Sequence, residues 1–576
     1  MNPDRAAYCS SVFQRLHPLF LAFLHAALFA LSFPPFDLWP LAFIAVAPLG
    51  LLAVRAQSTR GMLLSVLVTQ FAMWLWLLHW IIPVTAVGYP FLALYLSVWP
   101  AMFAWIIRRI SRQRQLSRRR MTIVVPVVWV GVEFFRGDVL FHGYPWYLLG
   151  HPLIAAPVLV QSADLAGTYF ISFLTAMVSG VIVDGFMLSG QREIARRAVV
   201  TASVVAGIWI ANLIYGAWRM DQNLPLTPGP RILAIQTNLP QDNKVGWSEE
   251  EQARDVPQFI EMTRAAAAQS TQPPDLIAWP ETMVPGLGFD PQTLNHLHLF
   301  GEPTAHLTRW PEAVQSLSNE MQVPFLVGSE AWVNTSIEED ADRRTATLRR
   351  ERTYNSAFLV QGDSPPQRYD KFFLTPFGET MPYISAWPWL EQQLLALGAQ
   401  GMQFNLDSNP DIAILTLHSP RMNQSYRLAT PICFEDTVAR FCRRMIYVDG
   451  VKRADMFMNL SNDGWFNTSD ADRKLHAQIA RFRCIENRVP MVRSVNTGMS
   501  LSIDSAGRLI GSVNGGGYGQ PRQAGWLWAE VTLDSRQTLY GKIGELFPAL
   551  CLIATILMLG WTFLSRGHRS NAERRA

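Results

Sequence analysis

The stretch TPICFED, Thr430–Asp436, closes a short apolar run with one cysteine and two acidic residues. A lone cysteine in an apolar run is most often a buried packing residue. At the end of a strand, however, a thiolate acts as a nucleophile when a base and a cation lie within reach. RLATPICFE predicts a strand that ends at Cys433 and Glu435, so the residues at the other strand ends decide between the two interpretations.

Strand and helix patterns alternate from Arg219 to Lys542, which predicts an α/β layered domain with helices covering sheets. The predicted strands are RILAIQTN, DLIAWPE, PFLVGSEAW, TYNSAFLVQ, IAILTLH, RLATPICFE, ADMFMNLSND and PMVRSVNTG. The predicted helices are Ser248–Ala267, Ala305–Met321, Thr437–Val448 and Asp470–Arg488. The charged insertion Val333–Asn355 predicts an exposed hairpin or loop without chemistry, with Asn355 returning to the core.

Three expected strand ends carry reactive side chains, and functional residues in layered α/β folds gather at strand ends. DLIAWPE ends in Glu281, RYDKFF presents Lys371 before Glu379, and ATPICFE ends in Cys433 and Glu435. Each of them alone is weak evidence. Together they make chemical sense: one carboxylate takes the thiol proton, and the ammonium stabilises the thiolate and then an oxyanion. A lysine that is shielded from water needs a carboxylate counter-ion to stay charged, and Glu379 and Glu435 are the candidates for this counter-ion.

Long apolar runs precede and follow this domain. Hydrophobic residues make up 49% of the 576 residues and charged residues only 16%, where soluble chains carry about 25%. A membrane-spanning helix needs about 20 apolar residues. The predicted spans are Pro18–Phe33, Leu38–Val54, Met62–Ile82, Tyr89–Ile107, Met121–Phe135, Leu165–Leu188 and Ala198–Ala217, with an eighth at Leu546–Leu564.

The sequence therefore predicts a membrane domain of seven helices over residues 1–218, an inserted catalytic domain over 219–542, and a last helix and tail over 543–576. The first run lacks a clear small-residue cleavage site, so we expect a retained helix. The loop Arg108–Arg120 and the tail Arg566–Arg575 are densely basic. Because positive loops stay in the cytoplasm, both termini are expected inside and the inserted domain outside. The net charge of +4 then reflects topology, and no nucleic-acid partner is expected.

Other polar residues offer little further chemistry. His25, His79, Glu133 and Asp184 lie in or near the predicted spans and are candidates for a function by default, with snorkelling at helix ends as the alternative for Glu133 and Asp184. The five cysteines are too few for a disulfide framework. A Cys442–Cys484 bridge stays possible, and no metal-ligand spacing is found.

Four motifs in order, WPE, YDKFFLTPFGE, PICFED and NLSNDGWF, resemble the nitrilase or carbon–nitrogen hydrolase superfamily. That resemblance implies an αββα sandwich and a Glu-Lys-Cys triad, without a cofactor or metal. Matched by motif, Glu281 would be the general base and proton acceptor, Lys371 the oxyanion stabiliser and Cys433 the nucleophile.

The whole layout, with QTNLPQDNKVGW, HGYPWYLLGH, QSADLAGTYFISF and HAQIARFRCIENRVPMVRSVNTG, resembles the apolipoprotein N-acyltransferase family. The resemblance implies an acyl-thioester on Cys433, a phospholipid acyl donor and a diacylglyceryl apolipoprotein acceptor. It also implies the bacterial inner membrane, with the catalytic domain in the periplasm. Trp247 would lie on a mobile arm near the site. Phe434 departs from the family pattern, which often has tyrosine there.

Tyr383–Gly398, YISAWPWLEQQLLALG, mixes tryptophans with leucines as an interfacial element does. We expect Trp387 and Trp389 to belong to a lipid-facing lid over Cys433, although core packing remains open for each. Two other functions also stay open at this point. One is a membrane-anchored nitrilase-type amidohydrolase, for which a single anchor would suffice. The other is a transporter or sensor, which would need no intact triad.

Overall fold

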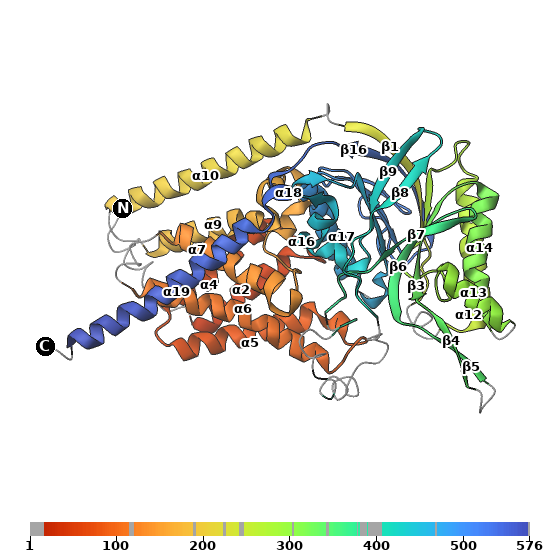
Figure 1. The fold of residues 1–576 in the computed structure, drawn as a ribbon. Helices are drawn as coiled ribbons and strands as arrows, with labels where there is room; N and C mark the ends of the chain where they lie inside the picture. The colour runs from red at the N-terminus through yellow and green to blue at the C-terminus, as the bar shows by residue number, and fades with distance from the viewer. Residues whose placement is uncertain are drawn as a thin grey trace. The chain divides into compact units, whose positions relative to one another are not determined.

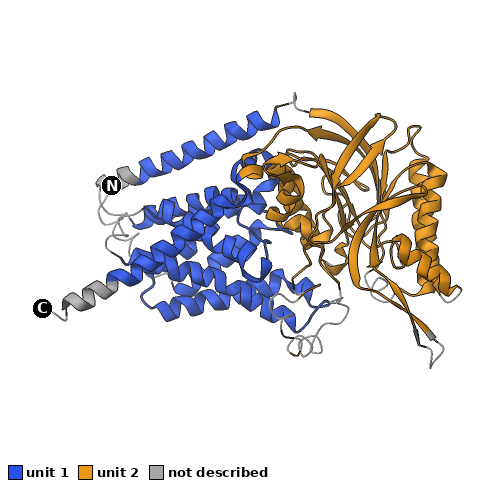
Figure 2. Cartoon of the chain, viewed as in Figure 1, with its two compact units in different colours: residues 1–221, 543–576 blue, residues 222–542 orange. Residues whose placement is uncertain are grey.

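A computed structural model describes most of the chain, in two compact units. The described residues are 17–113, 120–187, 192–222, 226–240, 247–301, 304–340, 345–376, 378–380, 387, 389, 406–466 and 469–573. Unit 1 comprises residues 1–221 and 543–576, and unit 2 comprises residues 222–542 (Figure 2).

Unit 1 is a bundle of apolar helices (Figure 1). Among the residues described, five helical segments are long and apolar enough to cross a membrane. They lie in α5 (Thr59–Leu77), α6 (Gly88–Ser111), α9 (Thr168–Met187), α10 (Arg192–Met220) and α19 (Leu546–Glu573). The chain thus has several helices that could cross a membrane. The predicted total of eight membrane-spanning helices stays a prediction.

Three predicted spans differ from the structure. Pro18–Phe33 is α2 (Pro18–Ser32), whose 15 residues extend only about 22 Å, against about 30 Å of hydrocarbon. Leu38–Val54 is not one helix. It is split into a 3-10 turn η1 (Trp39–Leu41), α3 (Ala42–Ala45) and α4 (Ala47–Arg55). Pro48 opens α4, and since proline has no N–H, it cannot continue the hydrogen-bond ladder of α3.

The predicted span Met121–Phe135 is α7 (Met121–Phe134), which continues as a π-helical turn over Phe135–Val139. The interpretation of Asp184 and Glu133 as snorkelling residues is wrong. Asp184 is buried and caps the start of α7, accepting from the backbone N–H of Met121 at 2.8 Å and of Thr122 at 2.9 Å. Glu133 is buried as well and accepts from the backbone N–H of Leu149 at 2.7 Å. Both carboxylates satisfy internal donors instead of reaching for water.

Unit 2 contains two six-stranded sheets. The first has the order β16 (Gly525–Asp534), β1 (Leu226–Gln236), β2 (Leu276–Ala278), β3 (Phe325–Val333), β6 (Arg352–Gln361) and β7 (Ser364–Asp370). The second has the order β15 (Leu509–Ser512), β14 (Leu501–Ile503), β13 (Met491–Val495), β12 (Met456–Ser461), β9 (Gln424–Ala429) and β8 (Leu415–Ser419). In each sheet three parallel strands are flanked by antiparallel neighbours.

The two sheets face each other and helices cover their outer faces (Figure 1). Ser494 of β13 donates across the gap to the backbone carbonyls of Ile235 in β1 and Ala278 in β2, at 2.9 and 3.2 Å. The first sheet is covered by α12 (Glu249–Ala267), α13 (Pro291–Phe300) and α14 (Ala305–Met321), and the second by α16 (Ala439–Ile446) and α17 (Asp470–Asn487). The predicted α/β nitrilase-like sandwich is confirmed.

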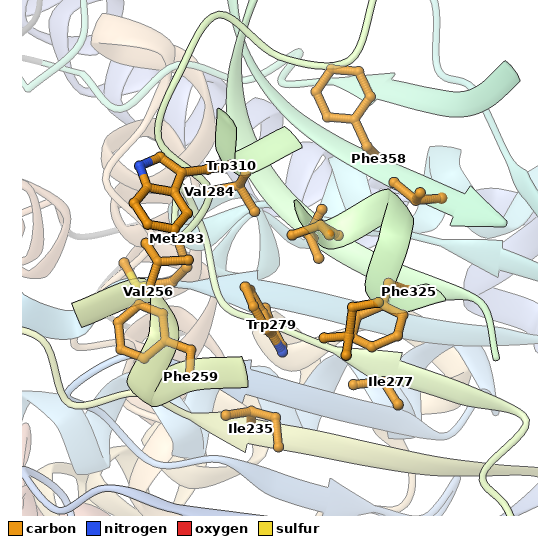
Figure 3. Packing of buried hydrophobic residues seen from close by; sticks show 14 of the residues in the cluster. Ile235, Val256, Phe259, Ile277, Trp279, Met283, Val284, Trp310, Phe325 and Phe358 are labelled. Atoms are coloured by element: carbon orange, nitrogen blue, oxygen red, sulfur yellow. The ribbon is translucent and has the colours of Figure 1, made fainter. Parts of the chain in front are cut away.

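The tryptophan of the WPE motif belongs to the core between the first sheet and its helices (Figure 3). Trp279 is fully buried against the rings of Phe259 in α12 and Phe325 in β3. Its indole N–H donates to Thr263 at 3.0 Å. This packing anchors the segment that leads into Glu281.

Two strands of the first sheet, β7 and β16, are not among the eight strands predicted from the sequence. β7 carries Pro365 and Pro366, which argue against a central strand, but it is an edge strand where a missing N–H is tolerated. β16 lies at the opposite edge. The charged insertion forms the predicted hairpin, from β4 (Ser336–Asp340) and β5 (Thr345–Arg349).

Candidate active site

Glu281 follows β2 and is held by two neighbours from distant strands. Its side chain is buried, with one oxygen accepting from the Asn355 amide and the other from the backbone N–H of Asn462, both at 2.8 Å. The next residue, Thr282, has φ of +51°. The turn is therefore tight, and both carboxylate oxygens are fixed in position.

This turn passes so close to β3 that only glycine fits at position 328. A Cβ on Gly328 would lie 2.4 Å from the Thr282 nitrogen and 2.6 Å from the Glu281 Cα. We expect Gly328→Ala to displace the turn and slow the reaction of the Cys433 thiol about 10- to 100-fold, as misplacement of a reacting group by about 1 Å does. Single-turnover kinetics measure this. The matched control is Gly516→Ala, because no heavy atom lies within 4 Å of a Cβ there; equal rates in the two variants would contradict the prediction.

Lys371 follows β7 and is enclosed by two carboxylates. Its ammonium lies 2.8 Å from one Glu379 oxygen and 2.9 Å from the other, and 3.7 Å from Glu281 Oε1. The side chain is only 1% exposed. Burial by itself lowers the pKa of Lys371, but the charges of Glu379 and Glu281 outweigh it and raise that pKa. The lysine is therefore a permanent cation next to Glu281.

Cys433 is the first residue of the 3-10 turn η9 (Cys433–Thr437) and has φ of +50°. The described cysteines are all free thiols. Cys433 is the partly exposed residue among them, and the others are buried. Burial of its sulfur, followed by the charge of Glu281, raises the pKa of the Cys433 thiol, while Lys371 acts in the opposite direction. The thiol is thus neutral at rest, and a base must remove its proton for attack.

Glu435 and Glu379 have separate tasks. Lys371 binds Glu379, which also accepts from the backbone N–H of Thr375 at 2.8 Å. Glu435 is fully buried. It accepts from the backbone N–H groups of Ile432, Phe372 and Phe373 and from the Tyr369 hydroxyl. It therefore fastens the segment after Lys371 to the turn that carries Cys433. Burial raises its pKa to about 7 in spite of these donors.

The structure brings together five of the eight predicted site residues: Glu281, Lys371, Glu379, Cys433 and Glu435. Among the described contacts, the three tryptophans make none with these five residues. Trp247 is half-buried and donates to Asp255 of α12 at 3.1 Å. Trp387 and Trp389 are 68% and 73% exposed, and most of the predicted lid lies outside the described residues. Phe434 stacks on Phe373, so its ring packs without a hydroxyl.

Three residues that contact the predicted site were not found from the sequence: Asn355, Asn462 and Tyr369. Tyr369 lies two residues before Lys371 in the same motif, and Asn462 lies in NLSNDGWF, so both motifs held a signal. Asn355 was expected in the core but without a partner. Within the described residues no cluster of His, Cys, Asp and Glu is arranged to hold a metal.

Known proteins are similar to this chain. The carbon-nitrogen hydrolase family matches residues 234–519, which places unit 2 in that class of enzyme. The apolipoprotein N-acyltransferase N-terminal domain matches residues 25–181. Among curated proteins, the apolipoprotein N-acyltransferase of Geobacter metallireducens is 30% identical, covering 94% of this chain and 95% of that protein. That of Rhodopirellula baltica is 28% identical over 92% and 94%.

The chain belongs to the apolipoprotein N-acyltransferase family, and it is an acyltransferase. A crystal structure of a CN-hydrolase superfamily protein from Xanthomonas campestris also aligns, at 14% identity and a TM-score of 0.32, covering 56% of this chain and 96% of that one. The assignment rests on the family matches and the full-length relatives. These also make the amidohydrolase the less supported alternative, because the likeness extends over the helices of unit 1.

Proposed function

We propose that this enzyme N-acylates the N-terminal S-diacylglyceryl-cysteine of apolipoproteins, with a phospholipid as acyl donor, as the last step of lipoprotein maturation. Cys433 carries the acyl group between the two substrates. The observation that supports this most directly is that the Cys433 thiol lies close enough to Glu281, Lys371 and Glu379 for their charges to act on it, in a chain that matches the family over 94% of its length.

In the first half-reaction Glu281 takes the proton of the Cys433 thiol as the sulfur attacks the carbonyl carbon of a phospholipid acyl ester. The oxyanion that forms lies against the Lys371 ammonium. When the intermediate collapses, the ester C–O bond breaks and the proton on Glu281 passes to the leaving alkoxide. A lysophospholipid departs and a thioester remains on Cys433.

In the second half-reaction the free α-amine of the diacylglyceryl-cysteine attacks the thioester carbonyl. Glu281 accepts a proton from the attacking nitrogen, and Lys371 again stabilises the oxyanion. Collapse breaks the C–S bond, the sulfur leaves as thiolate and regains the proton from Glu281. The product is an amide at the lipoprotein N-terminus, and the enzyme returns to its starting state.

Glu281 is suited to both proton transfers because its oxygens are fixed by neutral donors and one of them lies 3.7 Å from the Lys371 ammonium. Glu379 keeps Lys371 charged, so Glu281 is not consumed as its counter-ion. Two glutamates therefore have two roles: Glu281 is the base, and Glu379 is the counter-ion of Lys371.

The proposed setting is the inner membrane. The helices of unit 1 are long and apolar enough to hold the enzyme in a bilayer, and the basic segments Arg108–Arg120 and Arg566–Arg575 favour cytoplasmic termini. With eight spans, unit 2 would then face the periplasm.

The activity test uses the purified full-length chain in phospholipid nanodiscs with a synthetic S-diacylglyceryl-cysteine peptide. We expect the peptide to gain the mass of one acyl chain on its N-terminal nitrogen, with one lysophospholipid released for each product. An N-acetylated peptide, which has no free amine, is the control. Hydrolysis of the thioester to free fatty acid, with no acylated peptide formed, would contradict the proposal.

The exposed tryptophans supply a further prediction. Trp387 and Trp389 present large apolar faces, and we propose that they guide a lipid acyl chain to Cys433. The pair Trp387→Asp and Trp389→Asp should abolish acylation by phospholipid in bilayers. Alkylation of Cys433 by iodoacetamide, which needs no lipid, should stay within about twofold. Unchanged acylation would exclude a role in lipid entry.

A further inference from the structure

A buried chain of alternating charges lies directly behind the nucleophile. It runs from Arg493 of β13 to Asp436, on to His476 of α17, and ends at Asp463. The His476 imidazole lies 2.8 Å from Asp436 Oδ1 and 3.0 Å from Asp463 Oδ1, and all four side chains are at most 2% exposed. Two carboxylates hold the two ring nitrogens, so the imidazole is doubly hydrogen-bonded as a cation.

The two aspartates belong to the two turns that build the active site. Asp436 lies in η9, three residues after Cys433. Asp463 opens the 3-10 turn η10 (Asp463–Phe466), directly after Asn462, whose N–H binds Glu281. One imidazolium therefore connects the turn of the nucleophile with the turn that holds the base.

The turn of Cys433 needs such a connection. Its φ of +50° is uncommon for a residue with a side chain and persists only where the surroundings enforce it. Glu435 enforces it from one side through the backbone of Ile432. His476 and Arg493 hold the other side through Asp436.

We propose that protonated His476 is a positioning residue for acyl transfer: it fixes the Cys433 turn relative to Glu281 and balances the charge of two aspartates beside the thiol. The inference rests on the proposed function for its catalytic consequence. The bridge itself consists of the contacts of His476 with Asp436 and Asp463, and these contacts do not depend on the proposed function.

The charge of the bridge acts on the thiol with a definite sign. Asp463 raises the pKa of the Cys433 thiol. In His476→Gln the cation is lost, the aspartates are left with one balancing charge fewer, and the thiolate is disfavoured. In Asp463→Asn the negative charge itself is lost, and the thiolate is favoured. The two variants therefore shift the thiol in opposite directions, which a merely structural defect does not do.

The first measurement is the rate of Cys433 alkylation by iodoacetamide at about pH 8, near the usual thiol pKa, followed by mass spectrometry of the Cys433 peptide. We expect His476→Gln to alkylate several-fold more slowly and Asp463→Asn several-fold faster than the unmodified enzyme. Because alkylation needs no phospholipid, this result does not depend on the proposed function. A shift of both variants in the same direction, or no shift in either, would overturn the charge role.

The second measurement is acyl-enzyme formation from phospholipid in a single turnover. Both variants break the bridge, so both should lower the maximal rate about 10- to 100-fold with KM within about twofold. The control is Asp275→Asn, which removes another buried carboxylate whose contacts are Arg231, Ser419 and Arg421. A loss no greater than in this control would overturn the positioning role. If the unmodified enzyme forms no thioester, the proposed function fails instead.

A third measurement is the unfolding midpoint as a function of pH, which can be made with either variant if the other folds poorly. The charges facing His476 are Asp436 from η9, Asp463 from η10 and Arg493 from β13, with Arg473 on its own helix acting on Asp463. Burial by itself lowers the pKa of His476, but Asp436 and Asp463 outweigh it and raise that pKa to about 9. Because the folded value exceeds the unfolded value of about 6.5, the stabilisation is complete below that pH and is lost as the pH rises through about 9.

The difference in unfolding midpoint between the unmodified enzyme and His476→Gln should therefore be largest below about pH 6.5 and shrink as the pH rises from there to about 9. Asp463→Asn serves as the second variant for the same comparison. A difference that stays constant across this range would mean that His476 is not held as a cation, and would overturn the proposal.

Discussion

Cys433→Ala abolishes the acyl-thioester and with it all transfer to the acceptor. In the proposed mechanism this sulfur alone carries the acyl group, so no residual pathway through the same site remains, and the loss should exceed about 10³-fold. The measurement is the mass of the intact chain after incubation with phospholipid, where the unmodified enzyme gains one acyl chain and the variant gains none.

The fold should survive this change. The side chain shrinks by one atom in a site that is not fully enclosed, and alanine meets the same positive φ that cysteine already adopts. The unfolding midpoint is therefore expected within a few degrees, which corresponds to about 1 kcal/mol. Cys442→Ala is the matched control, because this thiol is free but buried away from Glu281 and Lys371 in the described contacts. Acylation that persists in Cys433→Ala would place the acyl group on another residue.

Lys371→Met has the second large effect, on both rate and stability. The change removes the cation from Glu379 and Glu281 and leaves two carboxylates buried together. Breaking a buried pair in this way costs about 3–5 kcal/mol. Loss of one oxyanion-stabilising group lowers the rate about 10²- to 10³-fold. We expect no detectable thioester and a clearly lower unfolding midpoint.

A double variant separates the two effects. Lys371→Met with Glu379→Gln removes the carboxylate that the lysine holds, so much of the lost stability should return. The rate should not return, because the ammonium is still missing beside Cys433. Thermal unfolding and single-turnover acylation of both variants measure this. Recovery of acylation in the double variant would show that Lys371 has only a structural role.

The sequence identifies the reactive residues of the site better than the contacts that position them. Glu281 and Cys433 follow predicted strands, Lys371 and Glu379 lie in the motif YDKFFLTPFGE, and the structure brings these four residues together. Asn355 and Asn462 are 74 and 181 residues away from the glutamate that they bind. Strand order within and between the two sheets creates these contacts, and no local pattern encodes it.

The membrane unit shows the same limit for helices. Composition alone predicts the apolar runs Leu165–Leu188 and Leu546–Leu564, and the long helices α9 and α19 lie there in the structure. Composition did not predict the break at Val46, because the run Leu38–Val54 is apolar throughout and only Pro48 signals it. The cap that Asp184 provides to α7 joins residues more than 60 positions apart and is equally invisible to a local pattern.

Full-length enzyme in bilayers is given a phospholipid with a tagged acyl chain and no acceptor, and the tagged peptide is mapped. We expect one tag for each chain, in thioester linkage on Cys433, released within one turnover when the diacylglyceryl-cysteine peptide is added. A tag on any other residue, or a tag on Cys433 that the acceptor amine does not remove, would contradict the proposed mechanism.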